Sequence, residues 1–133
     1  NAMSAEFKNK NVLIVDDSIV RGTTSKEIVQ MAKDAGANKV FFTSAAPPVR
    51  FPHVYGINMP NRVELIAHDR TISEIAAQLE IDNLVYQSVK NLRKSIISDS
   101  SIEDLEMSCF TGSYVTGTVS QEYLNWVENE YKS

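Results

Sequence analysis

The chain has 133 residues and a mass of 14.9 kDa; with 43% hydrophobic and 23% charged residues it can bury a core, which excludes an intrinsically disordered protein. Thirteen basic against seventeen acidic residues give a net charge of -4 with no block of like charges, which argues against a nucleic-acid or membrane-surface protein. The single cysteine, Cys109, excludes an internal disulfide or a CxxC pair and favours a reducing, cytoplasmic compartment.

The first fifty residues predict one βαβ unit with a parallel sheet, because such crossovers are almost always right-handed between parallel strands. Lys10–Val15 is a short apolar run, typical of a strand that is buried on both faces. Thr24–Glu27 has the pattern of a helix capping box, and Gly36 of a helix stop. Lys39–Ser44 is a second strand candidate. The predicted helix between the strands has an apolar face of Ile28, Met31, Ala32 and Ala35.

Prolines interrupt the pattern between residues 46 and 60, where we expect an irregular surface loop that holds His53 and Tyr55. Helices are expected to resume at two N-cap pairs, within Asn61–Glu64 and Thr71–Glu74. We expect the first of these helices to continue to Asp69. The second has an apolar face of Ile72, Ile75, Ala76 and Leu79.

Leu84–Gln87 predicts a third strand, and Ser88 an N-cap for the helix that follows it. Beyond residue 98 the pattern loosens to polar residues, a Cys109–Phe110 apolar patch and a short helix around Leu124. The predicted fold class is therefore α/β, with a parallel sheet of about three strands flanked by helices. The helix after Ser88 has an apolar face of Val89, Leu92, Ile96 and Ile97 and a solvated face of Lys90, Arg93 and Lys94.

The most informative stretch, residues 12–25, reads V-L-I-V-D-D-S-I-V-R-G-T-T-S. Asp16 and Asp17 end a strand, and a small, hydroxyl-rich loop then leads into a helix, which is where open α/β sheets bind ligands. Backbone N–H groups of this loop can bind a phosphate, and Gly22 allows close approach. Adjacent carboxylates accept hydrogen bonds from vicinal hydroxyls or hold Mg²⁺. Together these groups suit a sugar phosphate.

This stretch closely resembles the phosphoribosyl pyrophosphate (PRPP) loop of type I phosphoribosyltransferases. Later segments resemble one branch in particular, the glutamine phosphoribosylpyrophosphate amidotransferases, or amidophosphoribosyltransferases. The resemblance runs from about residue 11 to residue 127. The segments that carry it read S-A-A-P-P-V-R-F-P at 44–52, V-Y-G-I-N-M-P at 54–60, E-L-I-A-H at 64–68 and C-F-T-G-S-Y at 109–114.

The resemblance implies a partial type I phosphoribosyltransferase fold, with residues 4–98 as the C-terminal half of that domain and residues 99–133 as a C-terminal extension. Residues 1–3 are interpreted as an expression-tag scar. The family is a glutamine-dependent glycosyltransferase, which makes 5-phosphoribosylamine from PRPP and ammonia in the first step of purine biosynthesis. Its N-terminal glutaminase domain and pyrophosphate-covering loop do not fit before residue 11. We therefore expect this chain to hold no catalytic residue and to be inactive alone.

By resemblance, Asp16 and Asp17 hold the ribose hydroxyls of PRPP and its Mg²⁺, while the following residues bind the 5′-phosphate. Arg21 is expected only to add positive charge near a phosphate. Nucleoside monophosphates are expected as further ligands of the same loop. The PRPP-binding residues implied are Asp16, Asp17, Ser18, Ile19, Val20, Arg21, Gly22, Thr23 and Thr24, with Asp16 and Asp17 also as metal ligands.

Some family members carry an iron–sulfur cluster, with cysteines near residues 52–56 and in a CxxC pair that ends at the position of Cys109. His53 and Glu106 stand at the other two positions here, so no cluster is expected, because Cys thiolates are the usual ligands. We interpret Cys109 as a buried small apolar residue rather than a nucleophile. His53 is interpreted as a loop residue without a metal role.

Three other interpretations stay open at this stage. V-L-I-V-D-D-S also opens response-regulator receiver domains, which need further acidic, hydroxyl and Lys residues at later strand ends; Asp69 and Lys90 are the nearest candidates and fit poorly. A non-catalytic PRPP-loop protein could bind nucleotides for regulation. In the blandest interpretation, Asp16 and Asp17 merely end a strand and Thr24 merely caps a helix.

The partners predicted are small molecules and a second copy of the chain. Apolar runs fall far short of the roughly 20 residues that span a bilayer, and no signal peptide opens the chain, so no membrane partner is expected. Without the upstream half of its domain, the sheet would expose an unpaired edge and an apolar face. We therefore expect a homo-oligomer, of two-fold symmetry, that covers this surface.

Overall fold

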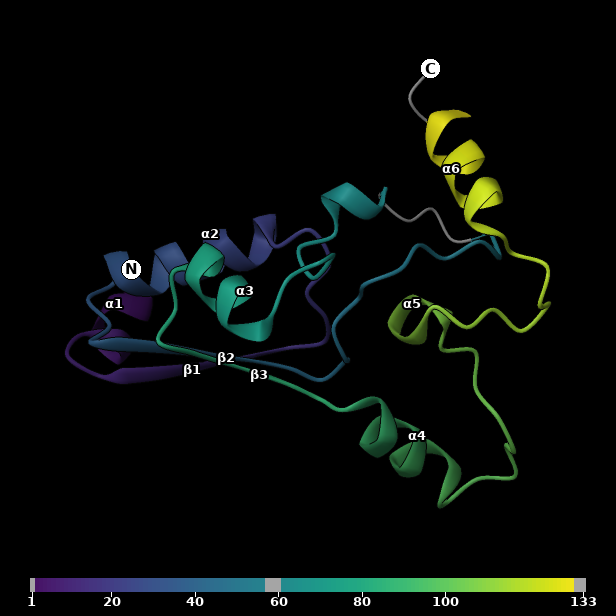
Figure 1. Cartoon of the computed structure of the whole chain (residues 1–133). Helices are drawn as coiled ribbons and strands as arrows, with labels where there is room; N and C mark the ends of the chain where they lie inside the picture. The colour runs from purple at the N-terminus through teal and green to yellow at the C-terminus, as the bar shows by residue number, and fades with distance from the viewer. Residues whose placement is uncertain (1, 57–60, 131–133) are drawn as a thin grey trace.

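The structure is a computed structural model that describes residues 2–56 and 61–130. The part of the expected loop at residues 57–60 lies outside the described residues. The strands form one three-stranded sheet. Figure 1 shows helices packed on one side of the sheet and a C-terminal part that extends beyond it. In chain order the elements are α1 (Ala2–Phe7), β1 (Asn11–Asp16), α2 (Thr23–Asp34), β2 (Lys39–Ser44), the 3₁₀ turn η1 (Arg62–Glu64), α3 (Ile72–Leu79), β3 (Asn83–Tyr86), α4 (Val89–Ile97), α5 (Ser108–Thr111) and α6 (Gln121–Glu130).

The sheet is parallel, as the sequence predicts, and its strand order is β1-β2-β3. The last residue of each strand is in register with its neighbour, so Asp16, Ser44 and Tyr86 lie in one row at the carboxyl edge of the sheet. β3 begins and ends one residue before the predicted Leu84–Gln87. The row brings the end of β1, where the two carboxylates lie, beside the loops that follow β2 and β3.

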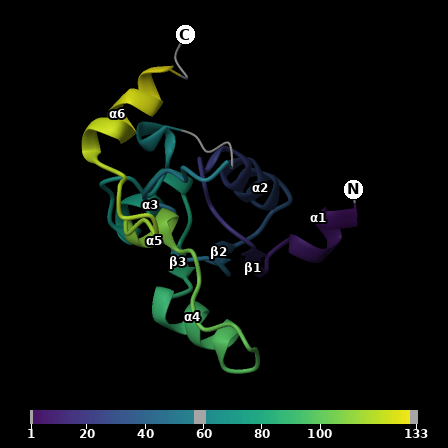
Figure 2. The same ribbon diagram turned by 90° about the vertical axis from the view of Figure 1, so that its right-hand side faces the viewer.

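The hydrophobic core lies between the sheet and the helices α2 and α3, which both cover the same face in Figures 1 and 2. Asp82 fastens the start of β3 to β2, because its carboxylate accepts a hydrogen bond from the Val40 N–H at 2.8 Å and its own N–H donates to the Val40 carbonyl at 2.9 Å. This core is what holds the β1–α2 loop in place. Its buried residues are Ile19, Val29, Ala32, Val40, Phe42, Ile66, Ala67, Ile75, Leu79 and Leu84.

The opposite face of the sheet is open, so the prediction that β1 is buried on both faces is wrong for this chain. Leu13 is 61% exposed, Val15 70% and Val85 56%. Successive side chains of a strand point to opposite faces, and both covering helices lie on one side. Within the described residues, the alternate side chains of β1 and β3 that point to the open side are therefore exposed to solvent.

Helix α2 differs from its prediction at its start and in its buried face. It begins at Thr23 with Gly22 as N-cap and no side-chain cap, so the capping box predicted at Thr24–Glu27 is wrong. Gly22 has φ 80°, and this left-handed residue lets the helix begin two positions earlier than predicted. The buried positions are Ser25, Val29 and Ala32, whereas Met31 of the predicted face is exposed.

The expected helix from Asn61 to Asp69 is only the 3₁₀ turn η1 followed by turns through residue 69. The N-cap pairing itself is confirmed, because the Glu64 carboxylate accepts a hydrogen bond from the Asn61 N–H at 3.0 Å. Several carbonyls between residues 65 and 70 accept hydrogen bonds from arginines instead. Arg50 donates to the Ala67 carbonyl at 2.7 Å, and Arg70 donates to the Ile66 carbonyl at 3.0 Å.

The α3 capping box is confirmed: the Thr71 N–H donates to the Glu74 carboxylate at 2.7 Å, and the Glu74 N–H donates to the Thr71 hydroxyl at 3.3 Å. The hydrogen bond from the Thr71 backbone N–H lowers the pKa of Glu74. Ser88 caps α4 as predicted, through a 3.1 Å hydrogen bond from the Asn91 N–H. Both helices therefore begin where their sequences indicate.

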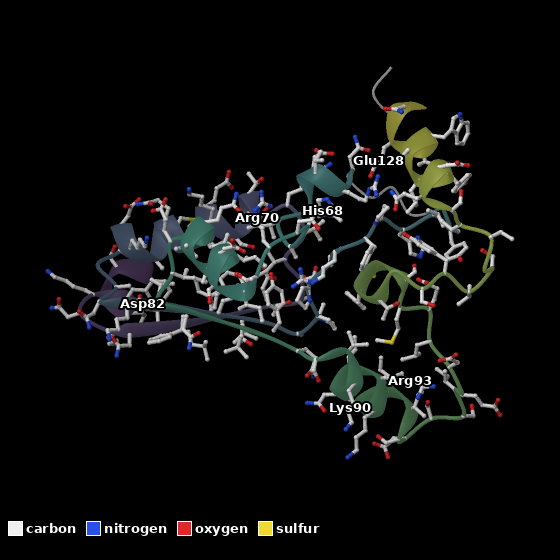
Figure 3. All side chains as sticks on the ribbon, viewed as in Figure 1. His68, Arg70, Asp82, Lys90, Arg93 and Glu128 are labelled. Atoms are coloured by element: carbon white, nitrogen blue, oxygen red, sulfur yellow. The ribbon has the colours of Figure 1, made fainter. Side chains whose placement is uncertain are left out.

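The C-terminal part is less buried than the sheet region. α4 holds no buried residue, and its basic side chains are exposed, as predicted; Figure 3 shows Lys90 and Arg93 pointing away from the sheet. The apolar patch at Cys109–Phe110 forms the short helix α5, which the sequence pattern did not predict. α6 contains the short helix predicted around Leu124. α1 includes residues 2 and 3 of the segment that we interpret as an expression-tag scar. None of the described helices has the length and apolarity that a bilayer crossing needs.

Candidate functional site

The β1–α2 loop lines a cavity of about 570 Å³ at the carboxyl edge of the sheet. Eight of the nine residues implied by the resemblance line it, and Ser25 joins them. Ser25 was not predicted; its place in the first turn of α2 is a signal that could have identified it. The lining residues are Asp16, Asp17, Ser18, Val20, Arg21, Gly22, Thr23, Thr24 and Ser25.

Ile19 is the predicted ligand-binding residue that does not line this cavity. Its side chain is 1% exposed and belongs to the core beneath the loop. An apolar residue here anchors the loop, because withdrawing it would expose buried surface to water. The next residue adds a second anchor: the Val20 carbonyl accepts a hydrogen bond from the Ile66 N–H at 2.9 Å. The side chain of Ile19 therefore has a structural role, and the ligand binding implied by the resemblance would fall to the backbone N–H of this residue.

The two carboxylates are held by their own backbone and by the loop after β2. The Asp17 N–H donates to the Asp16 carboxylate at 2.9 Å, and the Ser18 hydroxyl donates to the Asp17 carboxylate at 3.2 Å. The carbonyls of Asp16 and Asp17 accept hydrogen bonds from Ala45 and Ala46 at 2.9 and 2.8 Å. Each carboxylate keeps a second oxygen with no hydrogen bond from the described residues, so both can accept hydroxyls or a cation.

The first turn of α2 offers unpaired backbone donors to the cavity. The first helical hydrogen bond runs from the Lys26 N–H to the Gly22 carbonyl at 2.9 Å, so the N–H groups of Thr23, Thr24 and Ser25 precede it. No side chain caps this helix, unlike α3 and α4, whose first turns are capped by Thr71 and Ser88. The N-terminus of α2 can thus bind an anion through these donors and its dipole.

Gly22 is required at its position for two separate reasons. Its φ of 80° is unfavourable for residues with a side chain, and a Cβ atom there would overlap the Ile66 side chain. It would also lie 3.4 Å from the Leu79 side chain. The loop therefore packs directly on the segment after η1. Any other residue at position 22 would displace either the loop backbone or the Ile66 side chain.

Arg21 lies at the rim of the cavity, where its side chain is 3.3 Å from the Glu64 carboxylate and about half exposed. It also lines an adjoining cavity of about 330 Å³ with Lys26 and Gln78. Solvent screening makes such an exposed pair weak, so the guanidinium can reorient toward an incoming anion at little cost. Glu64 was not predicted as a site residue, because its sequence context indicates only a helix cap.

The positions tied by resemblance to an iron–sulfur cluster lie outside the cavity. His53 is 3.2 Å from the Glu106 carboxylate, and its side chain is 12% exposed, so it is a paired residue rather than an isolated loop residue. Burial raises the pKa of the Glu106 carboxyl, but hydrogen bonds from Ser108 lower it overall. Burial and the charge of Glu106 raise the pKa of the half-buried Cys109 thiol, which disfavours the thiolate that a nucleophile or ligand would need. Within the described residues, His, Cys, Asp and Glu form no group of three or more that could hold a metal.

The receiver-domain alternative is not supported. Asp69 lies in a turn, with φ 49°, and Lys90 lies within α4, so neither ends a strand as a receiver requires. The interpretation that Thr24 merely caps a helix is also wrong, because Thr24 does not cap α2. These corrections leave the cavity at Asp16–Ser25 as the candidate site.

The chain is similar over nearly its whole length to amidophosphoribosyltransferases. It is 51% identical over 131 residues to that of Haemophilus influenzae, with 98% of this chain and 26% of the relative covered. The Escherichia coli relative is 50% identical over 129 residues, with 96% and 26% covered, and that of Saccharomyces cerevisiae is 50% identical over 133 residues, with 100% and 26% covered. The chain thus spans about a quarter of the length of these relatives. No family model matches it.

Two solved structures share the fold. Glutamine PRPP amidotransferase from B. subtilis, complexed with ADP and GMP, is 38% identical with a TM-score of 0.76, and 84% of this chain and 25% of that chain are covered. A structure described as the allosteric regulatory enzyme of purine biosynthesis is 37% identical with a TM-score of 0.80, and 94% and 27% are covered. The chain matches the C-terminal phosphoribosyltransferase part of these enzymes, and the predicted partial type I fold is confirmed.

Proposed function

We propose that this chain is the part of an amidophosphoribosyltransferase that binds the ribose 5-phosphate half of PRPP. The parent enzyme would make 5-phosphoribosylamine from PRPP and glutamine-derived ammonia, in the first step of purine biosynthesis. One observation carries the proposal: two carboxylates with free oxygens and an uncapped helix N-terminus line the same cavity. About 50% identity to a quarter of each relative supports it.

In this proposal the loop and the first turn of α2 bind the 5′-phosphate, while the two carboxylates bind the ribose. The N–H groups of Thr23, Thr24 and Ser25 donate to the phosphate oxygens, and the hydroxyls of Thr23 and Thr24 can add further donors. The free oxygens of Asp16 and Asp17 accept hydrogen bonds from vicinal ribose hydroxyls. Gly22 brings the backbone close, because it carries no side chain between helix and ligand.

The donor set also fits the Mg²⁺ that accompanies a diphosphate. Asp16 and Asp17 would hold it, because Mg²⁺ favours one or two carboxylates together with water and substrate phosphate oxygens. Bound there, Mg²⁺ would neutralise charge on the departing pyrophosphate. The carboxylates of Asp16 and Asp17 also favour the positive charge that develops on the ribose ring during displacement at the anomeric carbon. We propose that the chain alone performs neither half-reaction.

Nucleoside monophosphates are proposed as further ligands of the same loop, since they carry the same 5′-phosphate and ribose. The B. subtilis neighbour, which was solved with ADP and GMP, supports nucleotide binding. The lone Cys109 suits the reducing cytoplasm, where we place the protein. We also propose that a second copy covers the open sheet face; its exposed side chains Leu13, Val15 and Val85 support this.

Titration calorimetry of the purified chain tests the proposal, with ribose 5-phosphate as ligand and ribose as the phosphate-free control. Amide spectra should show ligand-induced shifts at residues 18–25, and Mg²⁺ should strengthen binding. Asp17→Asn should weaken it by about tenfold, since a hydrogen-bonded charge contributes about 1.5–3 kcal/mol. Asp69→Asn, in an exposed turn, is the matched control and should bind normally. Shifts confined to other residues, or equal binding of ribose, would contradict the proposal.

A further inference from the structure

The C-terminal helix α6 is fastened to η1 by one arginine. Arg62 Nε lies 2.7 Å from one oxygen of the Glu128 carboxylate, and Arg62 Nη2 lies 3.0 Å from the other, so the pair is bidentate. The backbone N–H of Arg62 also donates to Glu128, at 3.1 Å, and Arg62 Nη2 donates to the Asn125 side chain at 2.6 Å. Four hydrogen bonds thus converge on a single residue of η1, and Figure 3 shows Glu128 on the side of α6 that faces it.

This ion pair differs from the surface pairs of the molecule because it is mostly shielded from water. The side chains of Arg62 and Glu128 are 19% and 16% exposed, whereas those of Arg21 and Glu64 are about half exposed. Parallel, charge-assisted hydrogen bonds fix both distance and orientation. Removing one partner of a shielded pair leaves the other desolvated, so the cost exceeds that of a surface pair. We therefore take this contact as the main fixed point of α6.

The segment that α6 holds is the one on which the candidate binding loop rests. Glu64 binds the Asn61 N–H through one carboxylate oxygen and lies 3.3 Å from Arg21 through the other. The Ile66 N–H donates to the Val20 carbonyl at 2.9 Å, and the Ile66 side chain packs against Gly22. Residues 61–66 thus contact α6 on one side and the loop 18–24 on the other, at three separate points.

We propose that Arg62 and Glu128 are positioning residues, and that docking of α6 through this pair sets the phosphate affinity of the β1–α2 loop. Neither residue lines the cavity, so any effect on binding must pass through the 61–66 segment. A small shift of Ile66 matters because Gly22 leaves no space between it and the loop backbone. This inference rests on the proposed function for its ligand, but the coupling itself can be measured without one.

The test compares Glu128→Gln with Glu122→Gln, an exposed acidic position on the same helix. Glu128→Gln removes the charge and keeps the shape, and it should weaken ribose 5-phosphate binding about five- to tenfold, at the low end of the usual coupling between sites. Arg62→Lys, which keeps the charge but loses the fork, should give a smaller loss in the same direction. The swapped double variant Arg62→Glu with Glu128→Arg should recover part of the affinity. The denaturation midpoint should fall in Glu128→Gln but not in Glu122→Gln, because the shielded Arg62 charge loses its partner, so binding is compared where every variant is fully folded.

Amide spectra of the ligand-free protein separate this inference from the proposed function. Residues 20–24 and 64–66 should shift in Glu128→Gln and stay in place in Glu122→Gln. If these shifts occur and no variant binds the sugar phosphate, the proposed function fails while the coupling stands. If the loop amides do not move, or if Glu128→Gln binds with the parent's affinity, the inference is overturned. Equal losses in Glu122→Gln would also overturn it, because they would show a general effect of charge.

Discussion

The two faces of the three-stranded sheet differ more than the sequences of their strands indicate. Neighbouring residues of β3 show the contrast: Leu84 is 4% exposed beneath α3, whereas Val85, on the other face, is 56% exposed. In β1 the open face leaves Leu13 and Val15 in solvent. Both faces are apolar in composition, but only one is covered within the described residues. The difference shows that an apolar strand sequence does not by itself establish that both faces of the strand are covered.

The covered face is also the face that builds the candidate site. α2 starts at the cavity and packs on this face through Val29 and Ala32, while Ile19 anchors the loop in the same core. Ile66 and Leu79, both of that core, contact Gly22 from below. The open face contributes no residue to the cavity. Site and core are therefore coupled on one side of the sheet, and the other side is free to serve as an interface.

The largest expected effect contrasts two neighbouring phenylalanines of β2. Phe42 is fully buried under the helices, whereas Phe41 is only partly buried on the open side. Phe42→Ala should lower the free energy of unfolding by about 3–5 kcal/mol, because it removes a large core side chain and leaves a cavity. Phe41→Ala should cost less than half of that. Urea denaturation of the two variants measures the difference, and equal losses would show that the open face is covered in solution.

The elements of the covered side could be predicted well from the sequence. Lys39–Ser44 has the bounds of β2 as observed, and the Thr71–Glu74 pattern identified the start of α3, because both depend on local propensity and on capping by near neighbours. The candidate binding loop was recognisable for the same reason: Asp16 to Thr24 are contiguous, so their arrangement follows from one strand end and one helix start.

Features that depend on distant contacts were not predictable. Met31 fits the helical pattern of α2, but the loop starts the helix at Thr23 and turns Val29 toward the sheet instead. The pairing of His53 with Glu106 joins residues 53 positions apart, and that of Arg62 with Glu128 joins residues 66 apart. No spacing rule links such residues, since their proximity depends on how the C-terminal part folds back.

Gly22→Ala tests whether the site depends on the covered core. The change should cost about 2–4 kcal/mol, from a left-handed backbone and from overlap with Ile66. It should also weaken phosphate binding, because the Cβ atom displaces either the loop backbone or the Ile66 side chain that packs against it. Gly117→Ala is the control: φ there is 66°, but nothing lies within 4 Å, so only the backbone cost of about 1–2 kcal/mol applies. Equal unfolding free energies for the two variants would argue against the packing of Gly22 on Ile66.

Tyr86 tests whether the covered side of the sheet holds a buried hydroxyl without a hydrogen bond. Its hydroxyl is buried and has no hydrogen-bond partner among the described residues. Tyr86→Phe should therefore raise the free energy of unfolding by about 1 kcal/mol at neutral pH. Burial raises the pKa of Tyr86 to about 12 from the ordinary 10.0. The unfolded chain thus releases this proton first, and stability should fall between pH 10 and 12 in the parent chain but less in the variant. Identical alkaline unfolding curves would contradict this environment for Tyr86.

A pair of threonine variants sharpens the comparison between the two helices on the covered face. Thr71→Ala removes the cap of α3 and should cost about 1 kcal/mol. Thr24→Ala should leave stability within about 0.5 kcal/mol, because Thr24 does not cap α2. Its effect should fall on phosphate affinity instead. Thermal unfolding and calorimetry together separate these outcomes; a large stability loss in Thr24→Ala would restore the capping role that its sequence pattern indicated.

The smallest expected effect on stability lies on the open face. Val15→Lys should change the free energy of unfolding by no more than about 0.5 kcal/mol, because Val15 is 70% exposed and supports no core contact. Its effect should appear in assembly, since a charge among the exposed apolar side chains of the open face opposes docking of a second copy. Light scattering over a range of concentrations should show association of the parent chain and a monomer for Val15→Lys. Gln30→Lys, at an exposed position of α2, is the control and should associate like the parent chain. A parent chain that stays monomeric would leave the open face to a different partner. Association that survives Val15→Lys would place the interface elsewhere on the molecule.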